Sequence, residues 1–96
     1  MIVLRQTTAE EYRQSNHTQF SWMQRGTLFV LEHADFDYSN RHGFPGVEQD
    51  IQFKATAQEV YEWIRTRGID IHVGSWRNWY AVPRTNIAVE FKLRFG

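Results

Sequence analysis

Apolar and polar residues alternate along several short segments of this chain, as they do in half-buried β-strands. The alternation is longest near the carboxyl end, where Ile87, Val89 and Phe91 are separated by single residues and the pattern continues to Phe95. Shorter segments are rich in the aliphatic and aromatic residues that favour strands. The predicted strands are 2–5, 18–24, 27–31, 51–55, 69–73, 79–82 and 87–95.

Two segments carry the sequence signal of a helix start. Thr8 is followed three residues later by Glu11, and Thr56 by Glu59, which is the spacing of a capping box. We predict one helix that begins near Ala9 and fades by residues 15–16. A second helix is predicted to end at the left-handed stop of Gly68, and its apolar positions are Ala57, Val60, Tyr61 and Ile64.

The segment 15–24 admits two interpretations. Phe20 and Trp22 alternate with other residues, and Arg25–Gly26 can form the turn of a hairpin that leads into the next strand. Alternatively, the first helix continues to Gln24. Composition alone does not decide between the hairpin and the longer helix.

Strands that alternate with only two helices, mostly through short turns, predict an α+β domain. We expect a mixed or mostly antiparallel sheet with two helices packed on one face. Residues 1–96 are expected to form a single compact domain, because 96 residues are too few to bury two cores. The polar stretch 35–47 contains Gly and Pro and predicts a long loop, while Pro83–Asn86 predicts the turn of a carboxyl-terminal hairpin.

Composition removes several classes of function. The chain holds no cysteine, which excludes disulfides, thiolate metal sites and cysteine nucleophiles. The longest apolar run, Leu28–Leu31, is far shorter than the ~18 residues that a membrane span needs. The amino-terminal residues lack the pattern of a secretory signal, so we expect a cytoplasmic location.

Charge is balanced overall but uneven along the chain, with 11 basic and 11 acidic residues in total. Residues 1–26 carry three basic and two acidic groups, 27–59 two and six, and 60–96 six and three. The balance gives no general attraction to nucleic acid or to an anionic membrane. The unevenness predicts opposed acidic and basic faces that can orient a partner.

A cluster of aromatic and basic residues near the carboxyl end is the main candidate for a binding surface. Trp, Tyr and Arg are the usual anchors of protein interfaces. Rings and basic groups together also form the stacking surfaces that hold single-stranded nucleic acid, provided that they share one sheet face. The predicted partner-binding residues are Trp76, Arg77, Trp79, Tyr80, Arg84, Lys92 and Arg94.

An acidic segment offers nitrogen and oxygen ligands without a recognised metal motif. Its candidate ligands for Mg²⁺ or Mn²⁺ are Glu32, His33, Asp35, Asp37 and His42. His33, Asp35 and Asp37 share one strand face only if the strand continues past residue 33. Nothing completes the coordination, so we expect a solvated strand end. We find no nucleotide-binding loop and no nucleophile motif, and we expect neither a cofactor nor an enzyme.

These observations favour a non-enzymatic protein-binding module that acts by steric occupation of a macromolecular partner. Small phage or mobile-element accessory proteins, including inhibitors of host complexes, are one class of this kind. The alternative is a domain that binds single-stranded DNA or RNA through the aromatic and basic carboxyl-terminal sheet face. The sequence identifies neither the partner nor the oligomeric state.

Overall fold

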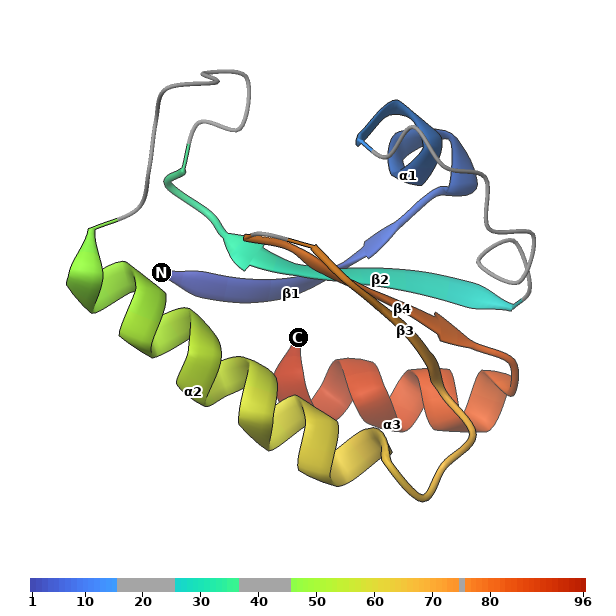
Figure 1. Ribbon diagram of the computed structural model, residues 1–96. Helices are drawn as coiled ribbons and strands as arrows, with labels where there is room; N and C mark the ends of the chain where they lie inside the picture. The colour runs from blue at the N-terminus through green and yellow to red at the C-terminus, as the bar shows by residue number, and fades with distance from the viewer. Residues whose placement is uncertain (16–25, 37–45, 75) are drawn as a thin grey trace.

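A four-stranded antiparallel sheet forms the centre of the computed structural model, which describes residues 1–15, 26–36, 46–74 and 76–96 (Figure 1). The strands are β1 (Ile2–Thr7), β2 (Thr27–His33), β3 (Asp70–Val73) and β4 (Asn78–Val82), in the spatial order β1-β2-β4-β3. Every neighbouring pair is antiparallel; Phe29 of β2 and Ile71 of β3 both lie opposite Tyr80 of β4. β3 is therefore an edge strand.

Helices cover both faces of this sheet. α2 (Val47–Ile64) and α3 (Thr85–Phe95) lie on one face, and α1 (Ala9–Ser15) lies on the other (Figure 1). The predicted α+β class, with an antiparallel sheet and two helices on one face, is confirmed. The helices that share a face are α2 and α3, and the second of these comes from a segment predicted as a strand.

Side-chain alternation along β2 and β4 divides the core into two layers. Phe29, Leu31 and Tyr80 point toward α2 and α3, where they meet Phe53 and Phe91. The intervening residues point toward α1 and pack around its buried tyrosine; this second cluster contains Tyr12, Leu28, Val30, Trp79 and Ala81. Both faces of the central strands are buried, so these strands are nearly continuous apolar runs.

The start of α1 follows the predicted signal in part. The Thr8 hydroxyl accepts a hydrogen bond from the Glu11 backbone N–H at 3.2 Å, which is the first half of a capping box. The Glu11 carboxylate does not return to Thr8 but binds Arg5 and the Thr7 hydroxyl. Of the segment 15–24, Ser15 is the last residue of α1 and residues 16–24 lie outside the described part of the chain, as does most of the predicted loop 35–47.

The strand predicted at 51–55 is wrong, because these residues lie inside α2. Phe53 is buried but Ile51 is exposed, which is the burial pattern of a helix rather than of a strand with three inward residues. The predicted helix start at Thr56 also lies inside α2. The helix begins instead after Gly46, whose backbone N–H donates to the Gln49 side chain at 3.2 Å.

The strand and hairpin predicted for the carboxyl end are also wrong, because residues from Thr85 onward form α3. Ile87, Phe91 and Phe95 are spaced by four residues, so they satisfy the period of a helix as well as that of a strand. The deciding residue is Leu93, which is 81% exposed although strand alternation would place it inside. Pro83 and Arg84 lead into the helix instead of forming a turn between strands.

The left-handed conformation predicted at Gly68 is correct, with a φ of 67° in the region that favours glycine. The helix itself ends earlier, at Ile64, and Gly68 is the last residue of the turn that follows it and precedes β3. Among the helices of the described residues, none is long and apolar enough to cross a membrane.

Candidate functional site: the groove between α2 and β3

The predicted aromatic surface is not assembled, because its rings are inside the protein. Trp79 is only 2% exposed and packs under α1, and Tyr80 is fully buried on the opposite face of the sheet. Burial raises the pKa of Tyr80 to about 12. Neither ring can stack on a nucleotide base or anchor a partner without unfolding the core.

The predicted basic residues are also dispersed. Arg84 lies at the start of α3, and Lys92 and Arg94 are exposed on that helix rather than on a sheet face. Trp76 is half-buried in the connection between β3 and β4. The structure therefore does not bring these residues onto one surface with Arg77.

Arg77 belongs to a charged cluster that links α1 to the sheet. Its Nε lies 3.0 Å from Oε2 of the buried Glu32, whose Oε1 lies 2.6 Å from Nε of Arg5. Arg5 also pairs with Glu11, and this pairing lowers the pKa of Glu11 to about 2. Glu11 thus stays ionised at neutral pH, and the cluster is built for pairing rather than for proton transfer.

The acidic segment forms no ligand cluster in the described residues. β2 ends at His33 and the chain turns at once, so Asp35 does not continue the strand face as the metal hypothesis required. Oδ2 of Asp35 and Nε2 of His33 contact the terminal amine of Met1 at 3.3 and 3.0 Å. Asp37 and His42 lie outside the described part of the chain.

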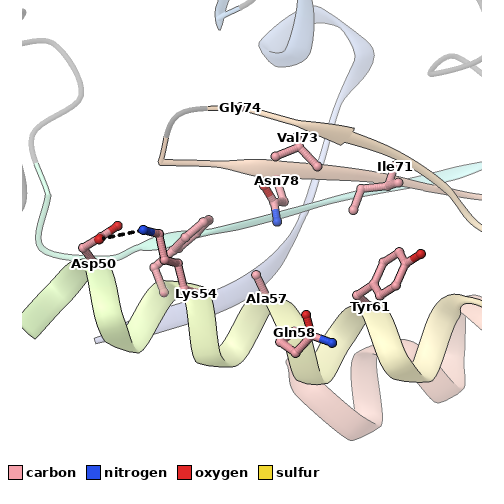
Figure 2. Close-up of a pocket in the computed structure, with 10 residues that line it drawn as sticks. Asp50, Lys54, Ala57, Gln58, Tyr61, Ile71, Val73, Gly74 and Asn78 are labelled. Carbon is pink, nitrogen blue, oxygen red and sulfur yellow. Dashed lines mark ion pairs between the residues drawn. The ribbon is translucent and has the colours of Figure 1, made fainter.

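A concave surface lies between α2 and the edge strand β3, and we call it the α2–β3 groove (Figure 2). It encloses about 390 Å³, and its walls are mostly apolar. Tyr61 and Ala57 of α2 face Ile71 and Val73 of β3 across it. The complete lining is Asp50, Phe53, Lys54, Ala57, Gln58, Tyr61, Ile71, Val73, Gly74 and Asn78.

Polar groups occupy one end of the α2–β3 groove. Lys54 Nζ and Asp50 Oδ2 form an ion pair at 3.1 Å along α2 (Figure 2). Asn78 projects from β4 at this end and is only 4% exposed. Its Nδ2 donates to the Tyr80 hydroxyl at 3.4 Å, whereas its Oδ1 is a buried acceptor without a hydrogen-bond partner among the described residues. Such an acceptor favours a ligand that brings a donor.

Alternate residues of β3 direct their backbone N–H and C=O groups toward β4 and away from it. The Gly74 backbone N–H donates to the Arg77 carbonyl at 2.8 Å, so these residues form a hydrogen-bonded pair of the ladder with β4. Hydrogen-bonded and non-hydrogen-bonded pairs alternate along an antiparallel ladder. Ile71 and Val73 therefore direct their N–H and C=O groups outward, away from β4, while their side chains line the groove.

The sequence did not indicate this groove, because the first part of its α2 wall, residues 51–55, was predicted as a strand. A signal was available in the spacing of Phe53, Ala57, Val60 and Ile64, which places four apolar residues on one face of a helix that starts before Thr56. Searches with the sequence and the structure against family models, curated proteins and solved structures gave no match. Functional conclusions therefore depend on this geometry.

Proposed function

We propose that this chain is a non-enzymatic protein-binding module that receives an extended segment of another polypeptide along the open edge of β3. The observation that carries the proposal is the orientation of Ile71 and Val73, whose backbone groups face outward while their side chains line the α2–β3 groove. A segment that pairs with β3 gains backbone hydrogen bonds and inserts alternate side chains into the groove, as in other cases of strand addition.

The groove supplies both affinity and selectivity in this proposal. Its apolar walls favour aliphatic side chains, and Val73 is 66% exposed, so a bound segment removes apolar surface from water. The buried Oδ1 of Asn78 favours a donor at the polar end.

Binding of this kind blocks a partner sterically and changes no covalent bond. It is therefore consistent with a small accessory or inhibitor protein that occupies part of a larger complex. The absence of cysteine fits action in the reducing cytoplasm. Binding of single-stranded nucleic acid is not proposed, because Trp79 and Tyr80 are buried and Lys92 and Arg94 lie on α3.

The test is selection of short random peptides on the immobilised protein at low density. Selected peptides should carry aliphatic residues at alternate positions and should bind Val73→Asp at least about tenfold more weakly, which is ~1.4 kcal/mol. Leu93→Asp, a matched change at an exposed position of α3, should bind them as the unaltered protein does.

A second measurement reports on the backbone hydrogen bonds. Two versions of the peptide are compared, one N-methylated at the odd-numbered amides and one at the even-numbered amides. One version should lose binding and the other should keep it, because only one set of amides faces β3. Peptides that bind Val73→Asp and the unaltered protein equally, or that tolerate N-methylation in both versions, would overturn the proposal.

A further inference from the structure

The outer edge of β3 pairs with no strand of the described residues, and its protection is limited to a length of four residues and one carboxylate, Asp70. Edge strands are commonly shielded by shortness, by Lys or Pro, or by an inward-pointing charge. The other edge strand of the sheet, β1, has such a charge in Arg5, which is held in ion pairs with Glu11 and Glu32. β3 has the sequence Asp-Ile-His-Val, without Lys or Pro, and its apolar residues are the ones whose backbone groups face outward.

From this edge, and resting on the proposed function, we infer that the strand received by β3 is β3 of a second copy of this chain. The two strands pair antiparallel about a two-fold axis at Ile71. Ile71 then lies opposite Ile71 of the other copy, and Val73 lies opposite Ile69. The backbone groups of Ile71 and Val73 face outward, so the Ile71 pair is a hydrogen-bonded pair, and the pair of Val73 with Ile69 is one too if the extended chain continues by one residue before β3. The result is a continuous eight-stranded sheet.

The polar residues of β3 select this register. With Ile71 on the axis, each Asp70 lies directly opposite a His72, and these are non-hydrogen-bonded pairs, whose side chains approach most closely. A carboxylate opposite an imidazole is favourable. A shift by two residues in one direction puts Asp70 opposite Asp70, and in the other direction it puts His72 opposite His72. A shift by one pairs an outward-facing residue with an inward-facing one, which breaks the ladder.

In the same register, the apolar side chains of both copies lie on one face of the sheet and the polar side chains lie on the other. Ile69, Ile71 and Val73 share the face that bears α2, so the α2–β3 grooves of the two copies meet along one apolar row. Asp70 and His72 share the face that bears α1, where His72 contacts Tyr12. Where the two β3 strands pair, apolar side chains therefore meet apolar side chains on one face, and carboxylates meet imidazoles on the other. An arbitrary edge strand does not provide this match.

Charge reversal tests both the occupant and the register. The unaltered protein should sediment as a reversible dimer whose fraction rises with concentration. Asp70→Lys places lysine opposite His72, and His72→Asp places aspartate opposite Asp70, so each variant alone should dimerise at least about tenfold more weakly. An equimolar mixture of the two pairs lysine with aspartate at one position and restores the Asp70–His72 pair at the other, and native mass spectrometry should show the mixed dimer in excess over either homodimer.

Two matched controls change charge elsewhere. Glu90→Lys and Asn86→Asp alter exposed positions of α3 by the same charges and should dimerise as the unaltered protein does. Amide hydrogen exchange gives a readout that needs no variant, because the Ile71 and Val73 amides should exchange more slowly as the protein concentration rises. This measurement remains available if His72→Asp, which loses its contact with Tyr12, fails to fold.

The outcomes separate this inference from the proposed function. A protein that stays monomeric at millimolar concentration, or a dimer that persists unchanged in Asp70→Lys, overturns the second-copy inference. If such a protein still binds the selected peptides through Val73, strand addition along β3 stands with a different partner. If neither peptides nor a second copy bind at β3, both proposals are wrong.

Discussion

Tyr12 and His72 are 60 residues apart in the chain, yet the Tyr12 hydroxyl lies 2.6 Å from Nδ1 of His72. The Tyr12 ring also packs edge-on against Trp79 of β4, with ring centroids 5.2 Å apart. This contact ties α1 to the edge strand β3 from the side of the sheet opposite the α2–β3 groove. The docking edge that we propose is therefore supported from behind by a helix.

Replacing Tyr12 with phenylalanine tests this support. Tyr12→Phe keeps the ring against Trp79 but removes the hydrogen bond to His72, and we expect the free energy of unfolding to fall by about 1 kcal/mol. The Asp70–Val73 amides should also exchange hydrogen faster. Tyr61→Phe, at an exposed tyrosine of α2, is the control and should change neither quantity. Equal stability of the two variants would show that the Tyr12–His72 contact contributes nothing.

Glu11 should make stability depend on pH in the acidic range. Its pKa is lowered from 4.5 to about 2, chiefly by the hydrogen bond from Arg5. A lowered folded-state pKa means that the contribution of Glu11 is fully present above pH 4.5 and is lost as the pH falls toward 2. Urea unfolding at a series of pH values should therefore show a decline across this window that is shallower in Glu11→Gln.

The neighbouring Glu10→Gln is the matched control, because Glu10 is exposed and precedes Glu11 in the same helical turn. It should reproduce the pH dependence of the unaltered protein. If Glu11→Gln and Glu10→Gln have the same dependence, the Arg5–Glu11 pair has no role in acid stability.

Two substitutions separate a helix from a strand at residues 85–95. Phe91 is fully buried and contacts Phe29 with ring centroids 5.0 Å apart, so Phe91→Ala should cost about 3–5 kcal/mol. Leu93 would be equally buried in a strand but is exposed on α3, so Leu93→Ala should change stability by less than ~0.5 kcal/mol. Thermal or urea unfolding measures both. A large loss in Leu93→Ala would contradict the helix.

Gly26, at the start of β2, should not tolerate a side chain. Its φ is 75°, and a Cβ there would lie 2.2 Å from the Val82 carbonyl oxygen, which is backbone and cannot rotate away. We expect Gly26→Ala to destabilise the fold by more than about 1 kcal/mol. Gly46→Ala is the control, because its Cβ would meet nothing within 4 Å. Similar unfolding midpoints for the two variants would contradict this account of Gly26.

Local signals in the sequence determined much of the sheet and the class of fold. The segments around β1, β2, β3 and β4 are runs of strand length rich in aliphatic and aromatic residues, and the Thr8 hydroxyl and the φ of Gly68 depend on chain neighbours. Such features need no knowledge of distant residues. This is why the α+β class and these four strands could be predicted.

The tertiary structure alone decided the rest, because the apolar spacing at two segments fits more than one period. Ile87, Phe91 and Phe95 can line a strand face or a helix face, and the packing of Phe91 against Phe29 and Tyr80 selects the helix. The same choice made residues 47–55 part of α2 and so created a wall of the groove. The sequence is equally compatible with Trp79 and Tyr80 as an exposed stacking surface and as core residues. They are buried because helices cover both faces of β4.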